Sequence, residues 1–310
     1  MGSIKLATWN LRFDSMPDSI TVQQSLDNFP GPLDRPSEFN NILPEMPWST
    51  RRIKVAQQLL DEDVVIADFQ EALKRQVDDM LQLLRLSGNP WDFVGVGRDD
   101  GVNAGEFSPV FYNTSQVELV EFDTFWLSPT PFVAGSKFPG SPTTIVLLNT
   151  HLDDQSDDQR QLGASLILQR ARFEAVNRKC PIIVTGDFNS TATGTDDSGA
   201  YKIITGAMPM VDIPADFADK FSVPDDSLPD FHMIDLRGQT DTLHVSGNFA
   251  TFTDFVAPEN SSNITDRIDF VFGGSNGGWL SSAYKVPSSL SDEGILASDH
   301  RPTFSSISFS

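Results

Sequence analysis

Short apolar runs recur along almost the whole chain, and most of them end in a cluster of polar residues. Several runs, such as TTIVLLNT, PIIVTGDF and RIDFVF, are apolar without a break, which is typical of strands buried on both faces of a sheet. We therefore expect strands at Ile4–Phe13, Val64–Phe69, Trp91–Val96, Val110–Val120, Thr144–His151, Pro181–Phe188 and Ile268–Phe272.

Helical periodicity separates these predicted strands. Ser49 or Thr50 is expected to cap a helix over RRIKVAQQLL, and the apolar residues of ALKRQVDDMLQLLRL form one stripe. Ser156 precedes a third predicted helix, whose first turn carries Asp residues. Strands and helices that intermix over the whole length predict an α/β or α+β domain.

No repeat, low-complexity block or clear linker divides the 310 residues, so we expect residues 1–310 to form a single domain. Two stretches, at about 14–48 and 207–232, are rich in Pro and acidic residues and have few periodic apolar positions. We expect both to be long loops that frame the mouth of a cleft and select the substrate.

The charge balance is strongly acidic, with 43 Asp and Glu against 22 Lys and Arg and a formal net charge of −21. Such a surface repels polyanions, and no stretch interleaves Lys or Arg with aromatic residues as a nucleic-acid groove would. A bound divalent cation can still make one cleft locally positive. The composition therefore argues against a basic binding surface but permits a metal site.

Other features bear on the compartment. The single cysteine, Cys180, excludes an intramolecular disulfide. No signal peptide is visible, and no apolar run approaches the ~18–20 residues that cross a bilayer. These features favour a soluble cytoplasmic protein without a transmembrane segment, whereas four N-x-[ST] sequons leave a secreted mature form open. The sequence indicates no obligate protein partner.

The polar clusters at the strand ends read TWNLR, FQE, NTHLDD, GDFN, TDRIDF and SDHRP. Taken singly, each is typical of a turn, a helix cap or a structural ion pair such as Arg267 with Asp269. Taken together, they supply amides, carboxylates and two of the four histidines. These hard oxygen and nitrogen donors suit Mg²⁺, Mn²⁺ or Ca²⁺ with acid–base partners.

The ordered set TWNLR, QE, GRDDG…GEFSPVFY, NTHLD, GDFN, RIDFVF and SDHRP resembles the endonuclease/exonuclease/phosphatase superfamily, which includes deoxyribonuclease I. The matches run in family order from residue 8 to residue 302, and their GRDDG and SPVFY versions are most similar to a fungal and bacterial branch. The resemblance implies an α+β fold, a four-layer α/β/β/α sandwich of two packed mixed sheets, with the site at one end of the sheets.

The same resemblance implies an enzyme that hydrolyses a phosphodiester or phosphomonoester with an activated water and a divalent cation, Mg²⁺ or Mn²⁺. The implied metal ligands are Asn10, Glu71 and Asp299. The implied catalytic residues are His151, Asp187, Asn189, Asp269, His300 and Glu106. The implied substrate contacts are Arg12 and Arg98.

Within this implied site, Asp187 orients and deprotonates the attacking water. His300 donates to the phosphate, and Asp269 orients its imidazole. His151 faces the phosphate from the other side with Glu106 as its partner.

Three functions stay open on these residues. The first is a nuclease acting on DNA or RNA, and the second is a phosphatase of a small soluble or lipid-head-group phosphoester, which an acidic protein tolerates better. The third is a catalytically weakened binding protein on the same scaffold. One departure from the family pattern suggests this third function. Before Asn149 the chain passes from a Pro/Gly loop directly into the strand, so one strand of a hairpin is missing, and Lys137 is the only cationic residue nearby.

Overall fold

Two mixed β-sheets lie face to face in this chain, whose computed structural model describes residues 3–36, 38–131, 145–193, 197–256 and 265–310. The larger sheet holds, in spatial order, β3 (Trp91–Val94), β4 (Val110–Asn113), β2 (Ile66–Gln70), β1 (Ser3–Asn10), β11 (Thr303–Phe309), β10 (Trp279–Val286) and β8 (Val245–Gly247). The smaller sheet holds β5 (Val146–His151), β6 (Ile182–Asp187), β9 (Asp269–Gly274) and β7 (Met233–Asp235).

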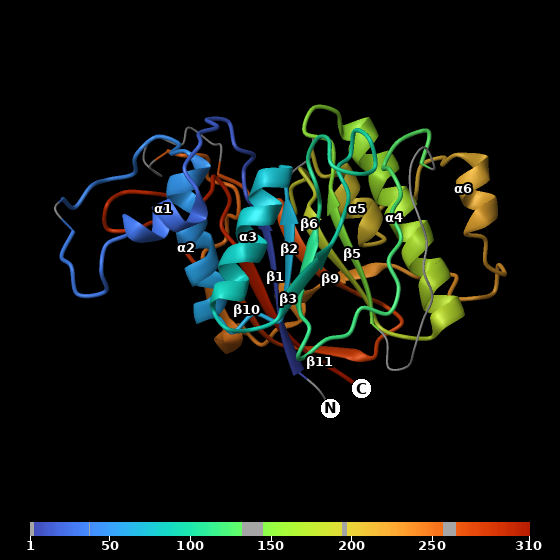
Figure 1. The fold of residues 1–310 in the computed structure, drawn as a ribbon. Helices are drawn as coiled ribbons and strands as arrows, with labels where there is room; N and C mark the ends of the chain where they lie inside the picture. Colours follow the sequence, from blue (N-terminus) through green and yellow to red (C-terminus); the bar gives the residue numbers. More distant parts are fainter. Residues whose placement is uncertain (1–2, 37, 132–144, 194–196, 257–264) are drawn as a thin grey trace.

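Helices cover the outer faces of both sheets, on opposite sides of the sandwich (Figure 1). The helices α2 (Trp48–Asp61) and α3 (Lys74–Leu86) pack on the larger sheet, and α4 (Asp157–Arg178) and α5 (Gly199–Ile204) pack on the smaller one. The layers therefore follow the order α/β/β/α. This arrangement confirms the predicted α+β, four-layer sandwich.

Three apolar cores hold the layers together. One lies between α2, α3 and the larger sheet and includes Trp9 and Phe69, and another lies under α4 and includes Val184. The third lies between the sheets and includes Leu6 and Ile183. Because β2, β6 and β9 are buried along their whole length, they lack the apolar–polar alternation of a half-exposed strand.

Several strand boundaries differ from the prediction. β4 ends at Asn113, so the predicted strand Val110–Val120 is too long. β1 ends at Asn10 rather than at Phe13, because Arg12 has a left-handed backbone with φ 54°. Thr144, Lys137 and the short arm before Asn149 lie at or beside residues 132–144, which are outside the described residues.

The helix starts give one confirmation and one correction. The Ser156 side chain accepts a hydrogen bond from Gln159 N and caps α4 as predicted. The predicted Ser49 or Thr50 cap of α2 is wrong, because the helix begins directly after Pro47. A proline at the start of a helix needs no cap partner for its own missing N–H.

The two predicted long loops each contain a short helix. Residues 14–48 include α1 (Val22–Asp27), and residues 207–232 include α6 (Ala215–Lys220), two helices of six residues that the prediction of long loops did not include. The remaining helical turns are α7 (Leu236–Gln239) and η1 (Thr242–His244). Among the described residues, every helix is too short or too polar to span a membrane. That residues 1–310 form one domain stays a prediction.

Asp68 is a buried carboxyl between the two sheets. It lies on β2, and Thr185 on β6 donates a 2.6 Å hydrogen bond to its Oδ2. Its Oδ1 has no hydrogen-bond partner in the described parts of the chain. Burial raises the pKa of Asp68 from 3.8 to about 7, although the Thr185 hydrogen bond opposes this shift.

We expect Asp68 to make the free energy of unfolding fall as pH rises from about 4 to about 7. In that window the folded chain keeps the Asp68 proton that the unfolded chain releases near pH 3.8. One pKa unit corresponds to about 1.4 kcal/mol, so the fall amounts to roughly 4 kcal/mol. Urea unfolding across this pH range should show that the free energy of unfolding falls in the wild type and that this fall is absent in Asp68→Asn. If the free energies of the two proteins change with pH in parallel, the raised pKa of Asp68 is contradicted.

Candidate active site

Strand register brings three of the predicted catalytic residues into one row at one end of the smaller sheet. In the parallel pair of β5 and β6, His151 lies opposite Asp187. In the antiparallel pair of β6 and β9, Asp187 lies opposite Asp269. Directly paired residues present their side chains on the same face, so these three side chains are neighbours.

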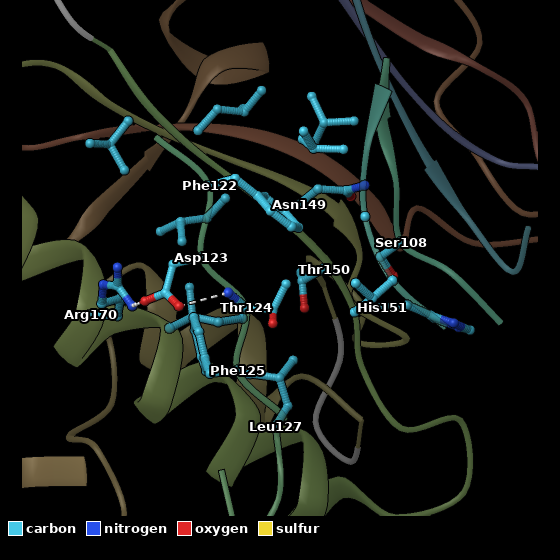
Figure 2. A pocket seen from close by; sticks show the side chains of 18 of the residues that line it. Ser108, Phe122, Asp123, Thr124, Phe125, Leu127, Asn149, Thr150, His151 and Arg170 are labelled. Atoms are coloured by element: carbon cyan, nitrogen blue, oxygen red, sulfur yellow. Dashed lines mark hydrogen bonds and ion pairs between the residues drawn. The ribbon is translucent and has the colours of Figure 1, made fainter. Parts of the chain in front are cut away.

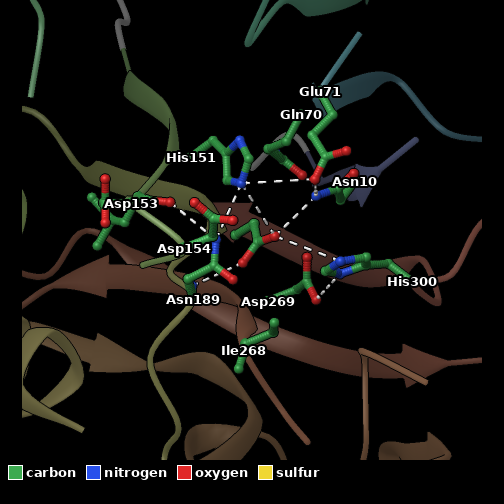
Figure 3. A network of polar contacts seen from close by, with 12 residues as sticks. Asn10, Gln70, Glu71, His151, Asp153, Asp154, Asn189, Ile268, Asp269 and His300 are labelled. Carbon is green, nitrogen blue, oxygen red and sulfur yellow. Dashed lines mark hydrogen bonds and ion pairs between the residues drawn. The ribbon is translucent and has the colours of Figure 1, made fainter. Parts of the chain in front are cut away.

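The larger sheet supplies the residues that face this row. Asn10 ends β1 and lies opposite Gln70, the last residue of the parallel strand β2, so Glu71 follows at the same edge. Asn10 Nδ2 donates to Glu71 Oε1 at 2.8 Å and to Asp187 Oδ2 at 2.9 Å. Asn10 thus links the two sheets at the centre of the network (Figure 3).

Two histidines lie near the same carboxylate oxygen. Nε2 of His151 and Nε2 of His300 are each 3.7 Å from Asp187 Oδ2. His300 Nδ1 lies 2.8 Å from Asp269 Oδ2, which is the contact that the predicted orienting role of Asp269 requires. The site thus holds a carboxylate between two imidazoles, with one imidazole fixed from behind.

Burial and mutual charge shift the proton affinities of this group. Burial, followed by the charge of Asp269, raises the pKa of Asp187 to about 6. Burial lowers the pKa of His300, but Asp269 and Asp187 outweigh it and hold that pKa well above 6.5. A carboxylate with a pKa near 6 accepts a proton more readily than an ordinary one, and a protonated imidazole can donate.

Three site residues have left-handed backbones: φ is 54° at Arg12, 57° at Glu71 and 45° at Asn189. Such conformations are strained without glycine and persist where the surroundings hold them. Here the neighbouring side chains do so, because Arg12 N donates to Asn10 Oδ1 and Asn189 N donates to Asp187 Oδ1, both at 2.9 Å. The polar side chains therefore shape the backbone that presents them.

The GDFN motif depends on its glycine. Gly186 has φ 139°, and a Cβ there would lie 2.0 Å from the carbonyl oxygen of Thr150 on β5. Glycine therefore allows the close approach of β5 and β6 that puts His151 beside Asp187.

The donor set fits a divalent cation. Glu71, His151 and Asp187 offer ligand atoms within 4.8 Å of one another, and His151 Nε2 is 3.9 Å from Glu71 Oε1. Two ligands about 2.1 Å from one ion lie at most ~4.2 Å apart, so this separation and the 3.7 Å to Asp187 Oδ2 are compatible with one ion. Asp299 is also buried, and burial raises its pKa. The cluster could bind a metal.

The comparison with known protein families decides the assignment. The model of the Endonuclease/Exonuclease/phosphatase family matches residues 7–300. The chain belongs to this family. It is therefore a member of a family of phosphoester hydrolases. No curated protein matches the chain in sequence.

Solved structures agree over the full length. An endonuclease/exonuclease/phosphatase from Bacteroides vulgatus is 26% identical, with a TM-score of 0.68 and 100% of both chains covered. A mannosyl-6-phosphatase from Bacteroides thetaiotaomicron is 24% identical, with a TM-score of 0.66, covering 99% of this chain and 100% of that one. D. rerio TDP2 with a single-strand DNA product is 14% identical, with a TM-score of 0.58 over 99% and 100% of the chains. The last two show the shared fold.

In this family member, Glu106 lies beside its predicted partner His151, and Arg98 lies beside Glu106. Glu106 Oε2 is 3.8 Å from His151 Nδ1, which is an ion-pair distance rather than a hydrogen bond. Arg98 Nη1 donates to the same oxygen at 2.8 Å, and the Arg98 side chain is 59% exposed. The direct partner of Glu106 is therefore Arg98, which orients it at the rim of the site.

Arg12 lies at the mouth of the site. Its Nε is 3.5 Å from Glu45 Oε1 and 3.9 Å from Asp299 Oδ2. Its guanidinium also stacks on the ring of Phe13, with 4.4 Å between the guanidinium carbon and the ring centroid. Arg12 is thus close to the candidate metal ligands and half-exposed.

The alternative ion pair between Arg267 and Asp269 is wrong. Arg267 instead donates twice to the carboxylate of Asp235, at 2.7 and 2.6 Å. Asp269 is left to bind His300, which strengthens the functional interpretation of the TDRIDF cluster.

The family site also contains supporting residues without a predicted role. Gln70 Nε2 donates to Asn149 Oδ1 at 2.7 Å, and Ser298 Oγ donates to the Asn10 carbonyl at 2.7 Å. All three residues belong to the polar clusters at the strand ends, so the sequence pattern already indicated that they lie near the site. Thr251 Oγ1 accepts the N–H of Asp269 at 3.0 Å. The sequence around Thr251 contains no motif that indicates this role.

Proposed function

We propose that the protein is a divalent-metal-dependent phosphoester hydrolase in which Asp187 activates water and His300 donates to the phosphoryl group. One observation supports this most directly: Asp187 Oδ2 lies 2.9 Å from Asn10 Nδ2 and 3.7 Å from the Nε2 atoms of His151 and His300. The base and the two phosphate donors therefore converge on one small space (Figure 3).

Glu71, Asn10 and Asp299 would hold the cation, Mg²⁺ or Mn²⁺; of these, Glu71 also belongs to the group of Glu71, His151 and Asp187 whose spacing is compatible with one ion. Once bound, the ion would offset charge on a phosphoryl oxygen and stabilise the leaving oxyanion. Glu71 and Asp299 supply carboxylates, and within the described residues Asn10 Oδ1 accepts a single hydrogen bond, from the Arg12 N–H, which leaves a second lone pair for a metal. This oxygen-rich set is the kind that both ions prefer.

The chain's own groups would carry the proton movements. Asp187, with its pKa raised by burial and Asp269 to about 6, would take the proton of the attacking water. Asn189 N, which donates to Asp187 Oδ1, would keep the other oxygen in place. His300, with its Nδ1 side held by Asp269, would direct Nε2 at the phosphoryl oxygen from the opposite side to His151.

A cavity of about 600 Å³ beside His151 favours a small phosphoester as the substrate. Glu106, Asn149 and His151 line one end of it, and apolar side chains such as Phe122 and Phe125 line much of the rest (Figure 2). A space of this size and character suits a compact organic group. With the net charge of −21, it favours a small ester with an apolar group over a nucleic acid strand.

Steady-state hydrolysis should rank the substrates. We expect kcat/KM for p-nitrophenyl phosphate, bis(p-nitrophenyl) phosphate or a short-chain phospholipid to exceed that for a single-stranded oligonucleotide. The expected margin is about 10- to 100-fold, because burial of one apolar group contributes about 1.5–3 kcal/mol. A preference for the oligonucleotide would contradict the substrate proposal. Failure to hydrolyse any phosphoester would contradict the hydrolase proposal and favour a binding protein.

A further inference from the structure

Arg51 is a fully buried arginine, and its hydrogen-bond partners among the described residues are all backbone carbonyls. It lies in the first turn of α2 with none of its surface exposed. Its Nη1 donates to the carbonyls of Leu11 and Ala297 at 2.8 and 2.7 Å, and its Nη2 donates to that of Arg12 at 3.1 Å. Its Nε donates to Met46 O at 2.9 Å.

Three of these carbonyls, those of Leu11, Arg12 and Ala297, lie next to the candidate metal ligands, whereas Met46 belongs to the segment just before α2. Leu11 and Arg12 directly follow Asn10 at the end of β1. Ala297 comes shortly before Asp299 in the segment that leads into β11. One guanidinium therefore joins two segments from opposite ends of the chain.

We propose that Arg51 is a positioning residue that sets the spacing of Asn10 and Asp299 by clamping these two segments. Its planar fork is suited to the task, because one rigid group holds donors at fixed separations. A lysine would carry the same charge without this geometry. The functional part of this inference rests on the proposed metal-dependent hydrolysis.

Two further observations support the clamp. The carbonyl of Arg12 belongs to a residue with φ 54°, a conformation that needs support from its surroundings. Burial lowers the pKa of Arg51 to about 10, with Asp299 and Glu45 opposing the shift, so the guanidinium stays charged at neutral pH. A charged donor makes stronger hydrogen bonds to carbonyls than a neutral one.

The next residue, Arg52, offers a matched control. It is also fully buried in the first turns of α2. It donates instead to Asp79 Oδ2 at 2.7 Å and to the carbonyls of Ile20 and Thr21 at 3.0 and 2.5 Å. It therefore anchors the segment before α1, and none of its hydrogen bonds in the described part of the chain goes to residues 11–12 or 297–299.

The test compares Arg51→Met and Arg51→Lys with Arg52→Met. Mn²⁺ binding by calorimetry and kcat on bis(p-nitrophenyl) phosphate report the site, and hydrogen exchange reports the two segments. We expect Arg51→Met to weaken Mn²⁺ binding and lower kcat by about 10- to 100-fold, the usual effect of losing an outer support of a metal site. Arg51→Lys should recover only part of this loss, and Arg52→Met should match the wild type in both quantities.

Equal Mn²⁺ affinity and kcat in Arg51→Met and Arg52→Met would overturn the inference. If Arg51→Met does not fold, the same comparison is made with Arg51→Lys, and wild-type values in that variant would overturn it. If the wild type neither binds Mn²⁺ nor hydrolyses phosphoesters, the proposed function fails. The clamp is then tested by hydrogen exchange alone. Faster exchange at residues 11–12 and 297–299 in Arg51→Met, but not in Arg52→Met, supports it, and equal exchange rejects it.

Discussion

Asp187→Asn is expected to lower kcat by about 10²- to 10⁴-fold, the usual contribution of a general base. Asparagine keeps the size of the side chain and an oxygen that can accept from Asn10, but it cannot take a proton from water. The variant should nevertheless stay folded. Burial already opposes the charge on Asp187, as its pKa of about 6 indicates, so removing that charge relieves a cost.

The matched control is Asp158→Asn, an exposed aspartate in the first turn of α4. It changes the net charge by the same amount without touching the site. Initial rates on bis(p-nitrophenyl) phosphate should fall in the Asp187 variant alone, while urea unfolding shows it to be at least as stable as the wild type. A wild-type rate for Asp187→Asn, or an equal loss in both variants, would contradict the assigned base.

His300→Ala is expected to lower both activity and stability. Loss of the donor should reduce kcat by about 10²- to 10⁴-fold. The change also leaves the Asp269 carboxylate buried without its 2.8 Å partner. Breaking a buried ion pair by removing one partner costs about 3–5 kcal/mol.

The double variant His300→Ala, Asp269→Asn separates these two effects. Neutralising residue 269 removes the unpaired buried charge, so the free energy of unfolding should recover while kcat stays low. His244→Ala, at an exposed histidine in η1, is the control for loss of an imidazole elsewhere. Recovery of kcat in the double variant would contradict the assigned pair. An equal loss in the free energy of unfolding for His300→Ala and for the double variant would contradict it too.

The sequence predicted those strands that are buried on both faces. β2, β6 and β9 are buried at every position because each lies inside the sandwich, and their apolar residues follow one another without alternation. β10 is not predicted because only three of its residues, Ser281, Tyr284 and Val286, are buried and an irregularity between Ser281 and Ala283 breaks their spacing, so WLSSAYKV shows neither a continuous apolar run nor a period of two. β7 and β8 are three residues each, too short for any period to show.

The candidate site was predictable because its side chains stand at strand ends. His151, Asp187 and Asp269 end or begin paired strands, so register alone makes them neighbours. Arg51 was not predictable in the same way. Its partners are carbonyl groups, which every residue carries, and only the folded chain shows which of them face the guanidinium.

The prediction of long loops missed α1 for a local reason. α1 is a single short helix whose start is fixed by a reciprocal pair of hydrogen bonds between Thr21 and Gln24. Such a capping box needs only a few residues and leaves no amphipathic stripe in a Pro-rich stretch. The cavity beside His151 was equally hidden, because its walls come from segments far apart in the sequence.

Dependence of hydrolysis on the metal tests the central proposal most directly. Protein stripped with chelator should not hydrolyse bis(p-nitrophenyl) phosphate, and titration with Mn²⁺ or Mg²⁺ should restore turnover in proportion to the metal bound. Glu71→Gln should require more metal for the same rate, because it loses the anionic ligand. Full turnover in excess chelator would contradict the account, since Asp187 and the two histidines would then hydrolyse the ester without the cation that Asn10, Glu71 and Asp299 are proposed to hold.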